Sequence, residues 1–338
     1  MIEQLDGLRK TLSDAMISCI DKRIVLYGYG YTGRFLKWYA KYYHGINVDY
    51  VITEDWTSSV SYDQELFRST LFGFGYKDVK DCVVWLAVPY SEEVVATIEK
   101  AQIEKDNIVD FIGLVYGDDI DWPDIKTDVF NQRKTGRRDI QFLEYLEWKY
   151  DCNFVTRIET DSFSDVKEGQ GAAFSANTQK ELFEIMDNIH YRPNENDAII
   201  DVGCGKGGAM LSFLDYGFKK VGGIEYETGL YDVLIDNLTK LNMHNNDNIR
   251  TIHGDASKIK EELDEYNWFY MFSPFYGDLF RAFIDNIKHS IERCPRKVRI
   301  IYAFPHEYRI IEESRAFRLC NQFTFTSKQR VVNVYESI

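Results

Sequence analysis

Apolar residues follow two periods along the chain, and the alternation of these periods predicts an α/β protein. Short apolar runs predict buried strands, and apolar residues three or four positions apart predict helices. Strands are predicted at 23–27, 48–53, 82–88, 108–114, 198–201, 221–226, 250–256, 268–276 and 298–303. Helices are predicted after the strand at 23–27 and over 91–101, 179–189, 209–214 and 279–291. The last stretch alternates over 323–326 and 330–335, which predicts a C-terminal antiparallel hairpin joined through Ser327 and Lys328.

The first 21 residues carry an apolar stripe with helical spacing. Its members are Ile2, Leu5, Leu8, Leu12, Met16 and Ile20. The stripe predicts an amphipathic helix. Packing against its own domain is favoured over a role in dimerisation.

The length of 338 residues and a change of character near the middle predict two domains. The first, residues 1–117, contains about four predicted strand–helix units, enough for a small Rossmann-like domain. Residues 118–164 are polar and acidic, contain Pro123, and lead into a helix through Leu143 and Leu146, as in a linker with a bridging helix. Residues 165–338 contain the remaining strands and form the second Rossmann-like domain.

The stretch AIIDVGCGKGG, residues 198–208, turns a predicted strand into a helix through a glycine loop. Gly203, Gly205 and Gly207 can take positive φ and let the backbone approach a bulky ligand. Amides at the start of the next helix point toward such a ligand. The stretch resembles motif I of the class I S-adenosylmethionine (SAM) methyltransferases, Asp/Glu-x-Gly-x-Gly-x-Gly, with Asp201 as its acid. The resemblance implies a cofactor site that includes Cys204; a dinucleotide-binding loop and a structural turn are the alternatives.

Two further acids follow predicted strands at the places that this family uses. Glu225 ends the strand VGGIE, where an acid can accept hydrogen bonds from ribose hydroxyls. Asp255, followed by Ala256, ends the next strand and is placed like the adenine-binding acid of the family. The resemblance therefore covers residues 165–338 and implies SAM as the cofactor.

The segment EGQGAAFS, residues 168–175, precedes a predicted helix. It resembles a segment that folds over the methionine end of SAM in bacterial SAM enzymes, which implies cofactor contacts for Gly171, Phe174 and Ser175. An ordinary helix N-cap by Ser175 or Asn177 is an equally good interpretation.

The predicted strand at 268–276 runs into Ser273, Pro274, Phe275 and Tyr276. This sequence is similar to motif IV, (Asp/Asn/Ser)-Pro-Pro-(Tyr/Phe), of amino-methyltransferases, in which it lies beside the transferred methyl group. Phe275 replaces the second proline, which leaves the acceptor atom open. A structural strand end is the alternative.

Two histidines follow predicted strands and are candidate bases. His306 comes after the strand at 298–303, and ligands of open α/β sheets lie outside the carboxyl ends of the strands. A histidine can accept a proton at neutral pH. His253 has similar standing, and for both residues a capping or surface role is the alternative.

The N-terminal domain contains a second glycine pattern, Gly28-x-Gly30-x-x-Gly33, between a predicted strand and a helix. Glu54 follows about 20 residues later, where a ribose-binding acid belongs. The domain resembles the small Rossmann-like domains attached to enzymes that make bacterial surface sugars, some of which hold a nucleotide-sugar. The alternative is a glycine turn needed for tight strand–helix packing.

Composition narrows the classes of partner and compartment. Apolar residues make up 45% of the chain and aromatic residues 15%, which suits packed cores. The net charge of −14 disfavours bulk nucleic acid as a partner, because basic residues form only short clusters such as 133–138. Six scattered cysteines without a CxxC pair indicate neither a disulfide framework nor a zinc site, and no metal site is predicted. With no signal peptide and no apolar run of about 20 residues, the sequence predicts a cytoplasmic protein.

These patterns predict a SAM-dependent methyltransferase acting on a small-molecule or glycan acceptor at oxygen or nitrogen, with a nucleotide or nucleotide-sugar as a candidate ligand of the N-terminal domain. A nucleotide- or SAM-binding sensor or scaffold without turnover is one alternative. A protein-lysine methyltransferase is another, because the stretch around GIEY resembles the non-SET histone lysine enzymes.

Overall fold

A computed structural model of the chain describes residues 2–29, 31–52, 82–88, 94, 96, 98–99, 101–116, 142–155, 179–244, 246–324 and 330–338. The chain divides into two compact units: an N-terminal unit, Gln4–Tyr145, and a C-terminal unit, Leu146–Ile338 with Met1–Glu3. The predicted domain limits at residues 117 and 164 both lie outside the described residues and stay predictions.

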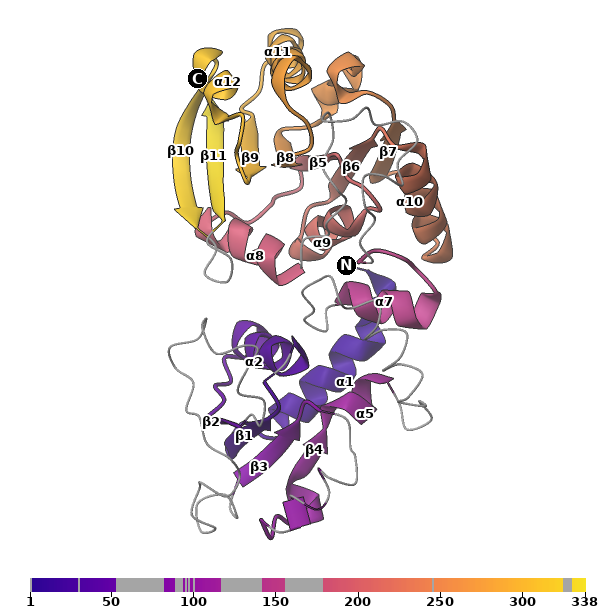
Figure 1. Ribbon diagram of the computed structural model, residues 1–338, viewed down its shortest axis with the longest axis vertical. Helices are drawn as coiled ribbons and strands as arrows, with labels where there is room; N and C mark the ends of the chain where they lie inside the picture. The colour runs from indigo at the N-terminus through magenta and orange to yellow at the C-terminus, as the bar shows by residue number, and fades with distance from the viewer. Residues whose placement is uncertain are drawn as a thin grey trace. The chain divides into compact units, whose positions relative to one another are not determined.

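The N-terminal unit contains a four-stranded parallel sheet in the order β2-β1-β3-β4 (Figure 1). Its strands are β1 (Arg23–Tyr27), β2 (Tyr50–Ile52), β3 (Cys82–Leu86) and β4 (Ile108–Asp110). Its helices are η1 (Glu3–Leu5), α1 (Asp6–Ile17), α2 (Tyr31–His44), η2 (Lys105–Asn107), α5 (Phe111–Tyr116) and the start of α7 (Phe142–Tyr150). The strand order reverses between β1 and β3, so their carboxyl ends mark the switch point where such sheets bind ligands.

The predicted strand at 108–114 is wrong in its second half, since β4 ends at Asp110 and α5 begins at Phe111. The Asp110 Oδ1 atom accepts hydrogen bonds from the Ile112 and Gly113 amides, both at 3.0 Å. A carboxylate that caps the first free amides favours a helix over a continued strand. The predicted helix at 91–101 lies largely outside the described residues.

The predicted N-terminal helix is confirmed as α1, which packs against α2 and α5. Leu8, Leu12 and Met16 are buried. The helix ends at Ile17, so Ile20 falls beyond it and is 56% exposed. The last member of the predicted stripe therefore does not contribute to the core.

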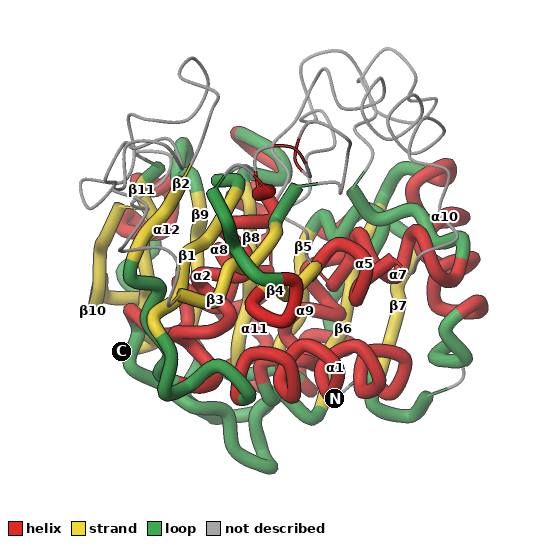
Figure 2. The backbone as a smooth tube through the Cα atoms, turned by 90° about the horizontal axis from the view of Figure 1, so that it is seen from below, coloured by secondary structure: helices red, strands yellow, loops and turns green. Residues whose placement is uncertain are grey.

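The C-terminal unit contains a seven-stranded sheet in the order β10-β11-β9-β8-β5-β6-β7 (Figures 1 and 2). Its strands are β5 (Ala198–Val202), β6 (Lys220–Glu225), β7 (Ile249–His253), β8 (Trp268–Phe272), β9 (Arg299–Ala303), β10 (Phe317–Thr324) and β11 (Val331–Ser337). Strands β5 to β9 are parallel to their neighbours, whereas β11 is antiparallel to both β9 and β10. The predicted α/β class and the closing antiparallel hairpin are confirmed, although Ser327 and Lys328 lie outside the described residues.

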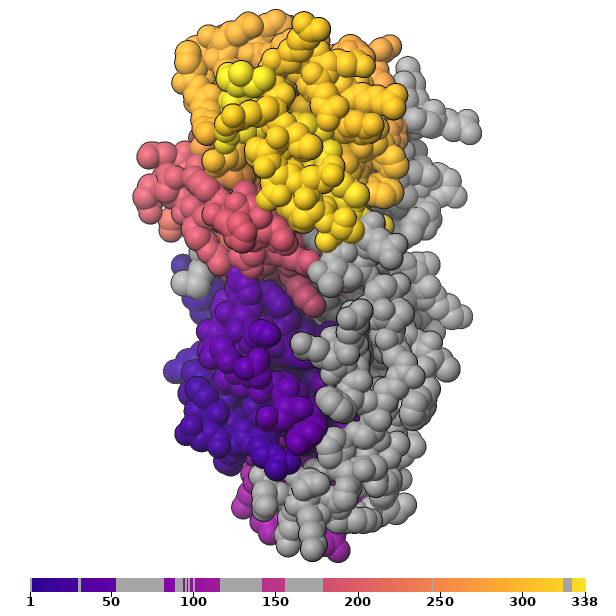
Figure 3. Space-filling view, turned by 90° about the vertical axis from the view of Figure 1, so that its left-hand side faces the viewer, coloured from indigo at the N-terminus to yellow at the C-terminus, as the bar shows by residue number. Residues whose placement is uncertain are grey.

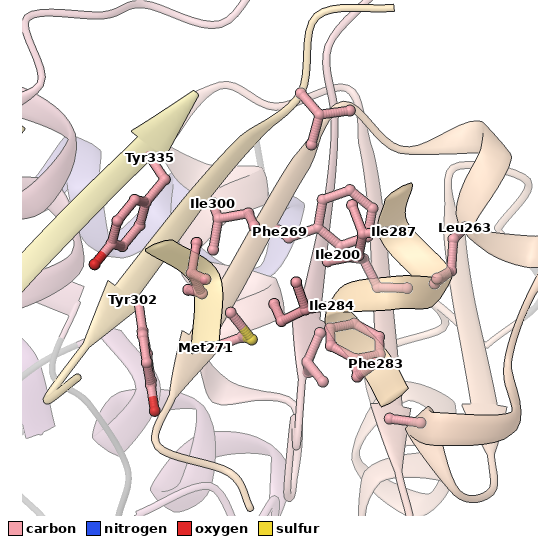
Figure 4. Close-up of a cluster of buried hydrophobic side chains, with 14 of the residues drawn as sticks. Ile200, Leu263, Phe269, Met271, Phe283, Ile284, Ile287, Ile300, Tyr302 and Tyr335 are labelled. Carbon is pink, nitrogen blue, oxygen red and sulfur yellow. The ribbon is translucent and has the colours of Figure 1, made fainter. Parts of the chain in front are cut away.

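Helices cover both faces of this sheet. They are α8 (Gln179–Asn188), α9 (Gly208–Tyr216), α10 (Thr228–Lys240), η6 (Ala256–Lys258), η7 (Glu261–Glu265), α11 (Gly277–Arg293) and α12 (Tyr308–Glu313). On one face, buried side chains of β8, β9 and α11 gather in one cluster (Figure 4). On the other face, the Tyr270 ring of β8 meets Phe213 of α9 at 5.1 Å. Asp201 pairs in register with Tyr270 and therefore points to the α9 face.

Strand β10 forms one edge of the sheet, and the end of the chain contributes to the outer surface of this unit (yellow in Figure 3). Residues along β10 alternate between exposed and partly buried side chains after Phe317. No helix among the described residues is both long enough and apolar enough to cross a membrane.

Candidate functional site

The glycine loop that follows β5 folds back over the end of β6. Gly203, Gly205 and Gly207 have φ values of 76°, 54° and 88°, in the left-handed region that favours glycine. The Gly203 and Cys204 amides both donate to the Ile224 carbonyl, at 2.9 and 3.0 Å. The loop is therefore anchored on β6 before α9 begins at Gly208.

Two of these glycines also lie against neighbouring side chains. A Cβ atom at Gly203 would lie 2.7 Å from the Pro274 Cβ, and one at Gly207 would lie 2.4 Å from the Leu234 Cδ1. Side chains at these positions would force their neighbours to move. The contact at Gly203 brings the glycine loop and the Ser273–Tyr276 segment together, as the two predicted halves of one site require.

The Cys204 side chain belongs to the core. It is 5% exposed, and its Sγ would lie 2.7 Å from a Cβ atom at Gly223. Burial raises the pKa of this thiol well above its usual value, and a buried protonated thiol is unreactive. Any cofactor contact by Cys204 thus falls to its backbone.

Asp201 is a nearly buried carboxyl group at the end of β5. Its side chain is 4% exposed and accepts no hydrogen bond from any residue that the structure describes. Burial, and next the negative charge of Glu225, raise its pKa to about 8. Burying an unpaired carboxylate is unfavourable, so Asp201 is largely protonated at neutral pH unless a cation lies beside it.

Glu225 ties the glycine loop to the end of β6. Its Oε2 accepts from the Gly205 amide at 2.8 Å, and its Oε1 accepts from the Tyr226 and Glu227 amides at 2.9 and 2.8 Å. Burial raises its pKa, and these three hydrogen bonds oppose the rise. An ionised carboxylate has about four acceptor positions, so one is left for a ribose hydroxyl rather than the two that the sequence suggested.

Asp255 caps the short helix η6. Its Oδ1 accepts from the Ser257 amide at 3.0 Å and from the Ser257 hydroxyl at 2.6 Å, and its Oδ2 lies 3.3 Å from the Lys258 Nζ. Burial opposes ionisation, but these partners hold its pKa below the usual value. Ala256 is buried beside it. Capping engages one oxygen of Asp255, and its predicted adenine contact stays a prediction.

His253 lies at the surface at the end of β7. Its ring stacks on Tyr231, with centroids 4.5 Å apart and planes at 12°. Its Nε2 is 3.4 Å from the Thr228 hydroxyl. These contacts account for His253 as a surface residue of α10 and β7.

Two non-glycine residues with left-handed backbone follow the ends of β8 and β9. Ser273 has φ 46° and Phe304 has φ 56°, and each comes directly after a residue of the registered pair Phe272 and Ala303. Ser273 is 3% exposed, and its Oγ forms no hydrogen bond of standard geometry with a described residue. Burial raises the pKa of Tyr302 to about 12, and the neighbouring Ser273 side chain opposes this rise. A buried hydroxyl thus lies at this edge of the sheet.

The remaining predicted acceptor residues divide into two groups. The Phe275 ring packs on Phe280 and Phe283 of α11, at 6.1 and 5.9 Å, and so belongs to the core. The Tyr276 ring lies 6.1 Å from His306, which is exposed and contacts Phe304. Tyr276 and His306 share the edge at which β8 and β9 end, whereas Phe275 turns away from it.

Several predicted site residues lie outside the described residues, namely Gly30, Glu54, Gly171, Phe174 and Ser175. Of the N-terminal pattern, Gly28 has φ 96°, and a Cβ atom there would lie 2.4 Å from the Val88 Cγ1. A Cβ atom at Gly33 would lie 2.0 Å from the Gly28 carbonyl oxygen. Tight packing alone accounts for both glycines, and the nucleotide site stays a prediction.

The sequence reasoning missed Lys206, which lies inside the glycine loop and is fully buried. Its Nζ donates to the Asn153 Oδ1 at 2.6 Å, and its carbonyl accepts from the Asn237 side chain at 3.1 Å. Burial lowers its pKa to about 8. A lysine in a glycine loop is usually read as a surface residue, and the sequence contains no signal that links it to Asn153.

No protein-family model matches the chain, and no curated protein matches it. Among solved structures, similarity was found to the glycopeptide N-methyltransferase MtfA in complex with S-adenosylhomocysteine, at 12% identity, over 46% of this chain and 90% of that chain, with a TM-score of 0.37. The putative RNA methyltransferase PH1948 from Pyrococcus horikoshii matches at 22% identity, over 47% and 79%, with a TM-score of 0.34. MtNAS in complex with MTA and tNA matches at 17% identity, over 47% and 60%, with a TM-score of 0.37. Similarity at this level identifies neither a ligand nor a reaction.

Proposed function

We propose that the C-terminal unit binds SAM and transfers its methyl group. The observation that carries this proposal is the pair of acids, Asp201 and Glu225, beneath a loop of three left-handed glycines. The Asp201 carboxyl is buried without a hydrogen-bond partner among the described residues, which is costly unless a cationic ligand lies beside it. SAM carries both a sulfonium and an ammonium group, so its charge suits this acid.

The other cofactor contacts follow from the same edge of the sheet. The free acceptor position of Glu225 suits a ribose hydroxyl. Tyr226, which follows it directly and is 48% exposed, offers an aromatic face to the adenine ring. Asp255 and Ala256 border the adenine position, and the segment of residues 168–175 covers the methionine end by the resemblance described above.

The acceptor is a small molecule or a glycan, methylated at oxygen or nitrogen, on the side of Ser273, Tyr276 and His306. Bound SAM supplies an activated methyl group that a nucleophile can attack in line. The chain contributes position: Pro274 lies against Gly203 and so holds the acceptor edge next to the glycine loop. His306 is exposed at this edge, where its imidazole can take a proton from a hydroxyl acceptor.

One observation favours a second candidate, a SAM-binding protein without turnover. The Phe275 ring lies in the core, and the second proline of motif IV is missing, so fewer groups surround the acceptor. Turnover therefore needs a separate measurement from binding.

Calorimetry with SAM tests the binding step in the wild type and in two variants, Asp201→Asn and Glu225→Gln. Each variant removes one charge without changing the shape of the side chain, and we expect at least a tenfold loss of affinity. Asp236→Asn is the matched control, because Asp236 is an exposed acid of α10 paired with Lys240. SAM affinity that is absent in the wild type, or unchanged in both site variants, would rule the proposal out.

We also propose a nucleotide or nucleotide-sugar ligand for the N-terminal unit, at the switch point beside Gly28. Thermal shifts of the full chain with dinucleotides and nucleotide-sugars test this site. Running the screen on Asp201→Asn separates it from the SAM site. If no compound shifts the unfolding temperature, packing is the whole explanation of these glycines.

A further inference from the structure

An arginine lies between two aromatic rings at the acceptor edge of the C-terminal unit. The Arg330 Cζ is 5.2 Å from the Phe272 ring centroid and 5.3 Å from that of Phe304. The two rings are 6.5 Å apart with planes at 20°. We call Arg330, Phe272 and Phe304 the arginine cluster.

The fold explains why this arginine reaches the site. Arg330 directly precedes β11, which is antiparallel to β9, so it lies where β9 ends. The Phe304 amide donates to the Val331 carbonyl at 2.9 Å and fixes this end of the hairpin. The cluster is therefore part of the carboxyl edge, where ligands of such sheets bind.

The cluster also lies on the same face as Asp201. Phe272 is two residues after Tyr270, so both side chains point to the α9 face. Burial first, and then the charge of Asp201, raise the pKa of Tyr270, while the positive charge of Arg330 opposes that rise. Arg330 and Asp201 thus act electrostatically on one tyrosine between them.

Backbone strain and exposure at the cluster indicate a role beyond packing. Phe304 has φ 56°, which is unfavourable for a bulky side chain, and its ring is 40% exposed. Ser273 has the same strained backbone at the end of the neighbouring strand. Strained residues of this kind gather at ligand sites. A purely structural strand end would need neither feature.

The geometry of the cluster suits an anion. Aromatic faces hold a guanidinium by its plane, so its N–H groups point outward in that plane. This arrangement matches the two oxygens of a carboxylate or a phosphate. In a chain with a net charge of −14, an acidic ligand needs a local cation in order to approach.

We propose that Arg330 binds an anionic group, a carboxylate or a phosphate, of the methyl acceptor. This inference rests on the proposed methyltransferase function and adds the chemical class of the acceptor.

Two pairs of small probes test the inference on the full chain in the presence of S-adenosylhomocysteine. Benzoate is compared with benzamide for a carboxylate, and phenyl phosphate with phenol for a phosphate. We expect one anion to bind at least tenfold more tightly than its neutral partner, and the identity of that anion separates the two sources. Arg330→Gln should abolish this preference, and Arg330→Lys should restore part of it.

Arg309→Gln is the matched control. Arg309 is an exposed arginine of α12 with its guanidinium 5.9 Å from the Tyr308 ring, and its loss should leave the anion preference unchanged. An unfolding curve of each variant shows whether the fold is kept, and Arg330→Lys supplies a second test if Arg330→Gln does not fold.

The outcomes separate this inference from the proposed function. Equal binding of charged and neutral probes, no binding of either anion, or an unchanged preference in Arg330→Gln overturns the inference. A matching loss of SAM affinity in Arg330→Gln would assign the arginine to the cofactor and overturn it as well. If the wild type binds no SAM, the methyltransferase proposal fails, whatever the anion probes show.

Discussion

The most informative single change is Asp201→Asn, because it separates the cost of a buried acid from its use. The pKa of Asp201 is raised from 3.8 to about 8. In the unfolded chain the group ionises near its ordinary pKa, so folding has to take up a proton at any pH between these two values. The folded protein therefore loses stability as the pH rises through this window.

The size of the effect follows from the shift. Each pH unit above 3.8 costs about 1.4 kcal/mol until about pH 8 is reached, which amounts to about 4 kcal/mol at pH 7. Relaxation of a buried site reduces such values, and about 2–4 kcal/mol is a fair range. Asn has the shape of the protonated acid and cannot ionise. We expect Asp201→Asn to stabilise the ligand-free protein by this amount at pH 7 and by almost nothing at pH 4.

Cofactor binding should respond in the opposite direction. A cationic ligand favours the ionised carboxylate, so the affinity of the wild type for SAM should rise between about pH 6 and 8 and then level off. Asp201→Asn should bind SAM weakly, with no such rise. Urea unfolding at pH 4 and pH 7 and calorimetry across pH 6–9 measure the two effects.

Asp236→Asn serves as the control, because Asp236 is 57% exposed and should change the free energy of unfolding by less than about 0.5 kcal/mol. Two results would refute the reasoning. One is a loss of stability in Asp201→Asn at pH 7, and the other is a SAM affinity that ignores both the pH and the substitution.

Three further changes address the rest of the chain. Burial opposes it, but three ion pairs lower the pKa of Glu336 to about 2, so the stability they provide is lost as the pH falls from about 4.5 to about 2. Since two of its partners are well exposed, Glu336→Gln should cost about 1–2 kcal/mol in urea unfolding at pH 7 and little at pH 2; an equal cost at both would contradict this. Lys206→Met should compare more favourably with the wild type as the pH falls from about 10.5 to about 8, because burial disfavours the charged amine; pH-independent denaturation curves would argue against it. Gly33→Ala, which places a Cβ atom 2.0 Å from a backbone oxygen, should destabilise the N-terminal unit by at least about 2 kcal/mol, whereas Gly7→Ala in the open helix α1 should stabilise it by about 0.5–1 kcal/mol; calorimetric scans that show equal effects would exclude the clash.

The local pattern was enough to predict most elements of the C-terminal unit. Consecutive apolar residues can only be buried from both faces of a parallel sheet, and the glycines at 203, 205 and 207 match three left-handed φ values. The terminal alternation predicted the hairpin for the same reason, since it leaves one face of each strand exposed. The prediction failed at 108–114, where one capping aspartate decided between two structures that apolar residues alone allow.

The chemical state of the site depended on contacts between distant segments. That Asp201 holds a proton follows from burial and from Glu225 on the next strand, and neither is visible in a glycine motif. The same holds for Phe275, which lies in the core because α11 offers it two aromatic partners. Residue type and spacing determined which groups are present near the site. Only the tertiary structure decided which of them are charged, buried or turned toward a ligand, because burial and charge pairing act through space and not along the chain.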